Sequence, residues 1–195
     1  MTGTLINIAT VLAGSALGVL LGNRLSDRMR ETVLRGLGLV TLAIGLQMTF
    51  ETANILIVLG AVLVGGLLGE WWGIEDGLRR VGGWLEARFN RADQPGEEGG
   101  NRFIRGFVTA SLLFCVGPMT ILGSIQDGLT GDYRLLAIKA MMDGFASLAF
   151  ASSLGIGVAF SALVVFVYQG GLSLLAAQAQ SLLSAAMIVE MTATG

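Results

Sequence analysis

The chain of 195 residues contains no histidine and only one cysteine, Cys115. Without histidine it lacks the most frequent general base and metal ligand of proteins. A single cysteine can form neither an internal disulfide nor a zinc cluster. These absences exclude a Ser-His-Asp hydrolase and a histidine-ligated metalloenzyme within one chain. Since no paired acid motif or nucleophile elbow is present either, we expect no enzyme, no metal and no cofactor.

Charged residues are also scarce, at 13% of the chain, while hydrophobic residues make up 53%. Soluble domains carry about 25% charged residues. The mean hydropathy of +0.73 points the same way. The alternative, a soluble all-helical protein, does not account for apolar runs of the length of a membrane span. We therefore predict an integral membrane protein.

Long apolar runs predict an all-α, polytopic transmembrane bundle of about six spans plus the start of a seventh, since one span needs about 20 apolar residues. We place the turn between spans five and six at residues 155–161, with residues 169–171 as the alternative. The chain then divides into three helices in 1–72, a polar loop in 73–105 and the remaining helices in 106–195. The runs are 4–22, 37–50, 55–72, 107–125, a double-length run at 135–175, and 182–189.

The arginines are concentrated between particular spans, and basic loops stay on the cytoplasmic side of a membrane. The loop around Glu51, on the opposite side, has no basic residue. The charge pattern thus predicts a bacterial inner-membrane protein with its N-terminus outside and with loops 23–35 and 73–105 in the cytoplasm. The arginines of these two regions are Arg24, Arg28, Arg30, Arg35, Arg79, Arg80, Arg88, Arg91, Arg102 and Arg105.

The polar loop contains an amphipathic segment. Leu78, Val81, Leu85 and Phe89 recur at helical spacing, and arginines occupy other faces. This pattern is typical of a helix that lies on the membrane surface and is attracted by anionic lipid. We therefore expect membrane lipid as a partner, and we disfavour nucleic acid or a calmodulin-like partner because the neighbouring spans already explain the pattern.

Small residues recur every four positions in two of the spans, an arrangement that lets helix backbones approach closely. We predict helix packing through these stripes, which also favours a homo-oligomer, with a pore or a moving interface as the alternative. The glycines concerned are Gly14, Gly18 and Gly22 in the first span, and Gly65, Gly69 and Gly73 in the third.

Gly117 and Pro118 interrupt the fourth span. Proline removes a backbone hydrogen bond and clashes with the preceding turn. Broken helices within a membrane often form ion or substrate sites in transporters. The interruption therefore predicts either part of a substrate path or a simple kink.

Lys139 and Asp143 are four residues apart, so on a helix they share a face, which Ser147 continues. Charges inside the membrane are costly and usually face the bundle interior or a cavity. Asp143, with its shorter side chain, is the stronger candidate for a solute or ion path, because Lys139 can extend toward the outer interface. Asp127, in the preceding turn, joins them as a candidate. The alternatives are a structural ion pair, or a span that begins later and leaves both charges among the lipid headgroups. For Asn7 and Gln169 we expect a hydrogen bond at a helix end or between helices rather than a ligand.

Several stretches resemble the DUF554 family, bacterial membrane proteins classed as a domain of unknown function that includes YqgA-like proteins. The resemblance covers nearly the whole chain and implies an inner-membrane protein of about seven spans. It implies no established substrate. Family members continue beyond residue 193 into another span, and a small residue is expected where Pro118 stands. The matching stretches are residues 3–7, 35–39, 107–117, 126–132, 143–144, 168–170 and 190–193.

These features predict a transporter or channel for a small solute or ion, with its site at Gly117, Pro118 and Asp143. The alternative is a membrane scaffold or regulator that moves no solute. Faint similarity between residues 15–18 and 152–155 suggests an internal repeat, which many transporter folds contain.

Overall fold

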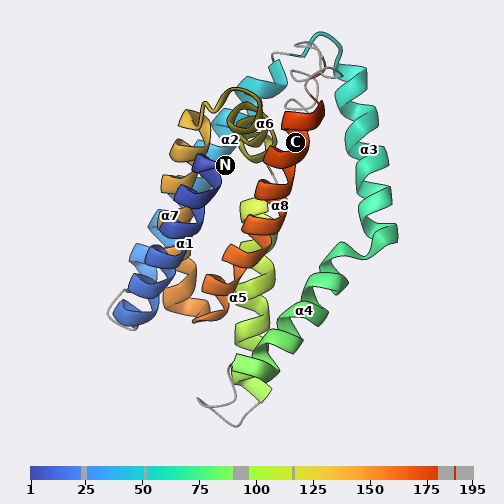
Figure 1. Cartoon of the computed structure of the whole chain (residues 1–195). Coiled ribbons are helices and arrows are strands. Elements are labelled where there is room, and N and C mark those ends of the chain that lie inside the picture. Colours follow the sequence, from blue (N-terminus) through green and yellow to red (C-terminus); the bar gives the residue numbers. More distant parts are fainter. Residues whose placement is uncertain (23–25, 51, 90–96, 116, 180–186, 188–195) are drawn as a thin grey trace.

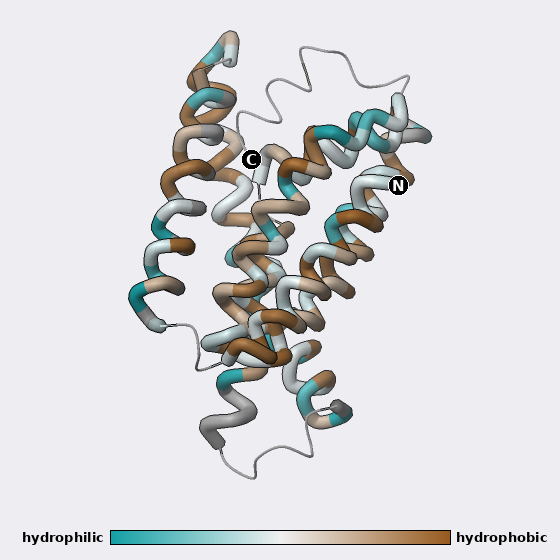
Figure 2. The backbone as a smooth tube through the Cα atoms, turned by 90° about the vertical axis from the view of Figure 1, so that its left-hand side faces the viewer, coloured by the Kyte–Doolittle hydropathy of each residue, from teal (hydrophilic) through white to brown (hydrophobic). Residues whose placement is uncertain are grey.

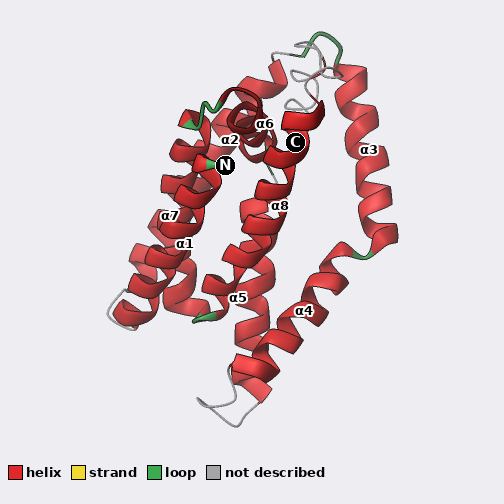
Figure 3. Ribbon diagram, in the orientation of Figure 1, coloured by secondary structure: helices red, strands yellow, loops and turns green. Residues whose placement is uncertain are grey.

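The structure is a computed structural model that describes residues 1–22, 26–50, 52–89, 97–115, 117–179 and 187. Every regular element in these residues is a helix, and they contain no strand (Figure 3). This confirms the predicted all-α class. The helices are α1 (Thr2–Leu21), α2 (Asp27–Phe50), α3 (Ile55–Trp72), α4 (Ile74–Phe89), α5 (Glu97–Cys115), α6 (Pro118–Thr130), α7 (Arg134–Leu154) and α8 (Gly157–Ala179).

Helices α1 and α7 form the most extensive contact in the bundle, and they run in the same direction (Figure 1). Gly3 at the start of α1 faces Leu136 near the start of α7, and Gly18 faces Ala151 farther along. α8 packs against α1, α5 and α6. It runs opposite to α1, because Gly170 near its end lies beside Thr4. The starts of α1 and α7 therefore share one end of the bundle.

The outside of the bundle is apolar, and much of the buried interior is polar. Leu20, Leu67 and Val167 are among many large apolar side chains left exposed, whereas Asn7 and Gln169 are fully buried. Figure 2 shows apolar residues along most of the length of the helices. This distribution is the reverse of that in a soluble domain and suits a protein whose surroundings are hydrocarbon.

Among the described residues, four helices are long and apolar enough to cross a membrane: α1, α3, α7 and α8. The number rises to five if α5 and α6 are one broken span. The predicted six spans plus the start of a seventh are therefore not reproduced. The predicted span 37–50 lies in α2, which begins with the charged segment 27–35 and is not among these helices. The seventh span, at 182–189, falls almost entirely outside the described residues.

The predicted span at 107–125 is interrupted. α5 ends at Cys115, α6 begins at Pro118, and the two helices differ in direction by 61°. Pro118 stands in the first turn of α6, where proline is favoured because its missing N–H group would have no partner. Gly117 precedes it with φ +154° and ψ 149°, a conformation that side-chain-bearing residues rarely adopt. The interruption is thus a helix end followed by a new helix, rather than a kink.

The turn between α7 and α8 lies at Gly155 and Ile156. Both residues fall within the predicted range 155–161. Gly155 has φ +80°, a left-handed conformation that favours glycine at the end of a helix. The alternative turn at residues 169–171 is wrong, because these residues lie inside α8.

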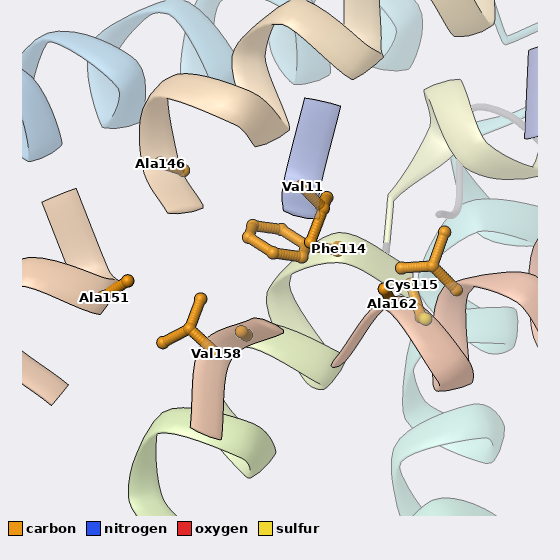
Figure 4. Packing of buried hydrophobic residues seen from close by; sticks show 9 residues of the cluster. Val11, Phe114, Cys115, Ala146, Ala151, Val158 and Ala162 are labelled. Carbon is orange, nitrogen blue, oxygen red and sulfur yellow. The ribbon is translucent and has the colours of Figure 1, made fainter. Parts of the chain in front are cut away.

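The apolar core lies where α1, α5, α7 and α8 meet. Phe114 of α5 is fully buried beside Val11 of α1 and Val158 of α8, and alanines of α7 complete the cluster (Figure 4). Small side chains dominate this core, so the helices approach closely. Cys115 is a free thiol buried at its edge.

The amphipathic segment forms α4, and its apolar face packs against α5. Leu85 is only 4% exposed and joins a cluster with Phe103 and Phe107, while Leu78 packs against the same cluster. Trp84 is on another face and is 65% exposed. One apolar face of α4 therefore contacts protein, and another remains open. Helix α5 already begins at Glu97, inside the predicted polar loop 73–105.

The two glycine stripes have different surroundings. A Cβ atom added at Gly14 would overlap the carbonyl oxygen of Gly144, and one at Gly18 would lie 2.9 Å from Cβ of Ala151. By contrast, a Cβ added at Gly65 or Gly69 would meet no described atom within 4 Å. The stripe of α1 is thus a close contact with α7, whereas the stripe of α3 faces open space.

Gly22 and Gly73, which end the two predicted stripes, serve as helix ends instead. Gly22 follows α1 with φ +37°, and Gly73 follows α3 with φ +58°. Both conformations place the backbone where only glycine is unstrained. Their role is therefore to stop a helix, which corrects their assignment to helix packing.

Candidate functional site

A buried hydrogen-bonded network joins α1, α7 and α8. The Asn7 side-chain amide donates through Nδ2 to Oδ2 of Asp143 at 3.0 Å and to Oε1 of Gln169 at 2.9 Å. Gln169 in turn donates through Nε2 to the Thr4 hydroxyl at 3.3 Å. The predicted interhelix hydrogen bonds of Asn7 and Gln169 are therefore present. We call these residues, together with Lys139, the polar cluster: Thr4, Asn7, Lys139, Asp143 and Gln169.

Lys139 and Asp143 form an ion pair inside the bundle, through Nζ and Oδ2. Lys139 is 6% exposed and Asp143 8% exposed. The expected extension of Lys139 toward the interface is therefore not what the structure shows, because the lysine side chain turns inward to the carboxylate. Asp143 lies near the middle of α7, about 14 Å from its first residue at 1.5 Å per residue. In a spanning helix, that position is deep in the hydrocarbon.

Asp127 forms a second polar contact with the start of α1. Its Oδ2 atom accepts a hydrogen bond from the backbone N–H of Gly3 at 3.1 Å and lies 2.8 Å from the Met1 amino nitrogen. The carboxylate is buried, and Asp127 stands in the last turn of α6. Because Gly3 and Asn7 are one turn apart on α1, Asp127 lies toward the end of the bundle from which the polar cluster extends inward.

Several buried polar atoms of the interior have no hydrogen-bond partner among the described residues. Such orphaned atoms are rare in folded proteins and call for a water, an ion or a ligand. Two belong to residues already named, Oδ1 of Asn7 and Oδ1 of Asp127. The others are the hydroxyl oxygens of Ser15, Ser111, Ser124, Ser147 and Ser173.

The predicted path residues are only partly brought together. Lys139 and Asp143 are paired, and Ser147 lies one turn farther along α7, against Gly14 of α1. Asp127 is linked to the same helix α1, but at its start. Gly117 and Pro118 lie at the break between α5 and α6, and no hydrogen bond of the described residues joins Gly117 to the polar cluster. Among the described residues, the break and the buried charges are thus not joined by hydrogen bonds.

Sequence reasoning gave Asn7, Gln169 and Thr4 no functional role. Their only signal was a polar side chain within an apolar run, which fits a hydrogen bond at a helix end equally well. What unites them is contact across 136 and 162 residues of chain, which a single sequence does not reveal. Among the described residues, no group of three His, Cys, Asp or Glu side chains could hold a metal ion.

The model of one protein family matches residues 2–195, under the description "Protein of unknown function (DUF554)". The chain is 31% identical to "Uncharacterized membrane protein YdfK" of Bacillus subtilis (strain 168), over 100% of this chain and 81% of the relative. It is 32% identical to "Uncharacterized protein YqgA" of Escherichia coli (strain K12), over 99% of this chain and 81% of the relative. No solved structure matches. With its apolar helices and polar interior, this chain is a membrane protein and belongs to the DUF554 family.

Proposed function

We propose that this protein is a transporter or channel that moves a small solute or ion across the bacterial plasma membrane, with the polar cluster as its site. The observation that carries the proposal is the Lys139–Asp143 pair, buried at mid-helix in a bundle with an apolar exterior. On insertion scales a charged residue at the bilayer centre costs about 2.5–3.5 kcal/mol. Apolar residues would hold α1, α7 and α8 together without that cost, so stability alone does not explain the pair.

The orphaned polar atoms support the same proposal. Asn7 Oδ1 and the Ser147 hydroxyl are buried beside the ion pair, on the two helices that contact most closely. A buried acceptor without a partner costs about 1–3 kcal/mol. Water or a polar solute in the interior would remove that cost. A wet interior at this depth is what a solute path requires.

The arginine distribution supports a defined orientation within this proposal. With basic loops inside, residues 23–35 and 73–105 are cytoplasmic, and the N-terminus and Asp127 lie toward the outside. The exposed Trp84 and the arginines of α4 then face the lipid headgroups of the inner leaflet. The open glycine stripe of α3 supports a homo-oligomer, since small residues drive helix association in membranes.

Flux measurements with the purified protein in liposomes test the proposed function. Radiotracer uptake tests sodium and potassium, and osmotic swelling tests small neutral solutes, each against protein-free liposomes. We expect at least one solute to move faster with the protein, and Asp143→Asn to remove most of this flux. The matched control is Ser152→Ala, because Ser152 is also buried on α7 but bonds only within its own helix. No flux for any solute, or equal flux in both variants, would contradict the proposal.

The open stripe of α3 also favours one alternative, a scaffold or regulator that binds another membrane protein. This alternative predicts no flux from the reconstituted protein. It also predicts that substitutions at Gly65 and Gly69 abolish function in cells, while Asp143→Asn does not. The liposome experiment separates the two functions without knowledge of the partner.

A further inference from the structure

We infer that Lys139 is an internal cation that holds the place of a small monovalent cation at Asp143, and that the transported or coupling cation displaces it. The inference deepens the proposed function and rests on it for the statement that the cation is transported or coupled to transport. The binding of the cation itself can be tested without transport. It joins two observations: the buried pair of Lys139 and Asp143, and the orphaned oxygens beside it.

The chemistry around Asp143 suits a cation. The side-chain oxygens of the hydrogen-bonded network and of the next turn of α7 come from three helices: the Asp143 carboxylate, Oδ1 of Asn7, Oε1 of Gln169, and the hydroxyls of Thr4 and Ser147. Oxygen atoms are the preferred ligands of hard cations. The Asn7 amide already uses its NH₂ group for Asp143 and Gln169, so its free atom is an acceptor. An anion would meet this acceptor and the carboxylate together.

The charge of the polar cluster favours a monovalent cation over a divalent one. Asp143 is its only carboxylate, since Asp127 is bound at the start of α1. One carboxylate balances one positive charge, which Lys139 supplies in this structure. Divalent ions in proteins usually have more than one carboxylate, together with several further oxygens. Replacing the lysine ammonium by sodium or potassium keeps Asp143 neutralised.

One orphaned oxygen, the hydroxyl of Ser147, belongs to the turn of α7 that follows Asp143, and the other, Oδ1 of Asn7, belongs to the amide that donates to Asp143 Oδ2. Lys139 is one turn before Asp143 on α7, and Ser147 is one turn after it, so both flank the carboxylate on the same face. Ser147 is fully buried, and its Cβ would lie 3.2 Å from a Cβ added at Gly14. Asn7 donates to the same carboxylate from α1. A cation between Asp143, Asn7 and Ser147 would satisfy both orphaned oxygens.

Lys139 also has a second place for its ammonium. It is only five residues after the start of α7, about 8 Å at 1.5 Å per residue. A flexible lysine side chain at that depth can extend to the interface and keep its charge in water. The side chain of Lys139 thus has two positions, the inward one of this structure and an extended one. A cation bound at Asp143 would favour the extended position.

The first test is thermal unfolding of the purified protein in a neutral detergent at constant ionic strength. Sodium or potassium chloride replaces choline chloride stepwise, because choline is too bulky for the polar cluster. A cation that binds only the folded protein raises the Tm with its concentration. We expect a small sodium- or potassium-specific rise in the wild type and none in Asp143→Asn.

The decisive variant is Lys139→Met, which keeps the length of the side chain and removes its charge. If Lys139 leaves Asp143 free about a tenth of the time, its removal raises the apparent affinity for the cation about tenfold. We expect the salt titration of Lys139→Met to move to correspondingly lower concentration. Lys139→Met without any sodium- or potassium-specific shift would overturn the inference.

A second pair of variants covers the case in which Lys139→Met does not fold. Ser147→Ala removes one proposed ligand while leaving the ion pair intact, and Ser152→Ala is its control on the same helix. We expect the wild-type cation shift to be lost in Ser147→Ala and kept in Ser152→Ala; equal shifts in both would overturn the inference. A cation shift without flux would leave the inference standing and refute the transporter. Flux of a neutral solute without any cation-dependent rise in Tm would support the transporter and overturn the inference.

Discussion

At the scale of single residues, the small size of a glycine is required in this protein where another backbone approaches it. Gly14 and Gly65 occur in similar stripes of small residues, yet among the described residues only Gly14 has a close neighbour. The carbonyl oxygen of Gly144 occupies the space that a side chain at position 14 would need. Because that oxygen belongs to a packed helix, it cannot move aside as a flexible side chain would.

This difference predicts opposite effects for the same substitution. Gly14→Ala should lower the free energy of unfolding by about 1–3 kcal/mol, the usual cost of overpacking. Gly65→Ala should be neutral or stabilising by up to about 1 kcal/mol, since alanine is the better helix former. Thermal unfolding in detergent measures both.

The oligomeric state of the same two variants, measured by size-exclusion chromatography with light scattering, adds a second result. A Gly65→Ala protein that dissociates into smaller species would place the stripe of α3 at a subunit contact. Equal destabilisation by both substitutions in a monomeric protein would contradict the packing difference.

The charged residues show which part of the polar cluster could be predicted from the sequence alone. The spacing of Lys139 and Asp143 was enough to predict a shared helix face, and the cost of charge in a membrane indicated that Asp143 is buried, but Lys139 was expected to extend toward the outer interface. Nothing local to Asn7 or Gln169 indicated that Asn7 would donate to both Asp143 and Gln169, because these hydrogen bonds cross from α1 to α7 and α8. A predicted pair thus became a five-residue cluster only through the fold.

At the scale of helices, the break between α5 and α6 depends on Gly117 more than on Pro118. Gly117→Ala should destabilise the protein by about 1–3 kcal/mol, because alanine is strained at φ +154°. No atom of the described residues outside its chain neighbours lies within 4 Å of a Cβ added at Gly117, so we expect the effect to come from backbone strain. Pro118→Ala should cost only about 0.4–1 kcal/mol, since it removes a preset φ at a helix start.

Thermal unfolding of these two variants, side by side, gives the comparison. If Pro118→Ala proved the more damaging, proline would be required for the break, as the sequence alone suggested. The flux assay on both proteins would then show whether the break contributes to a path. Within the part of the chain that the structure describes, no hydrogen bond links Gly117 to the polar cluster, so we expect flux to follow protein stability.

Helix α4 makes a second prediction at this scale, from two adjacent residues on different faces. Leu85→Ala should lower the free energy of unfolding by about 2–5 kcal/mol, because it opens a cavity beside Phe103 and Phe107. Trp84→Ala should leave folding nearly unchanged, since its side chain is 65% exposed.

Lipid contact separates the two α4 variants further. In liposomes with bromine-labelled phosphatidylglycerol, the fluorescence that Trp84→Ala removes should be quenched by the labelled lipid. Unquenched Trp84 would show that its face is covered by protein. A stable Leu85→Ala protein would show that α4 is not held by α5.

At the scale of the whole molecule, hydrophobic runs predicted the class correctly and the number of spans less well. The run at 37–50 became part of the longer helix α2, which begins with charged residues 27–35. The run at 107–125 was divided by a backbone conformation at Gly117 that hydropathy does not register. The turn after Leu154 was predicted because glycine interrupts an otherwise uniform apolar stretch. Composition thus reveals the surroundings of the helices, whereas backbone geometry decides where each one stops.

The fold fixes which loops share a side of the membrane, and charge then decides which side is inside. Because α7 separates Asp132 from Ile156, these exposed residues must lie on opposite sides if α7 spans. Ser26 follows α1, which runs parallel to α7, so Ser26 lies on the side of Ile156. Arg24 and Arg28 predict that this side is cytoplasmic.

Single cysteines at these positions, in a Cys115→Ala background, test both statements with a membrane-impermeant maleimide. In intact cells we expect labelling of Asp132→Cys only, and labelling of Ser26→Cys and Ile156→Cys after permeabilisation. The cysteine-free parent is the control. The inverse pattern would keep the fold but place the N-terminus inside. Labelling of Asp132→Cys and Ile156→Cys from one side would show that α7 does not span, and Asp143 would then lose the depth on which its proposed role depends.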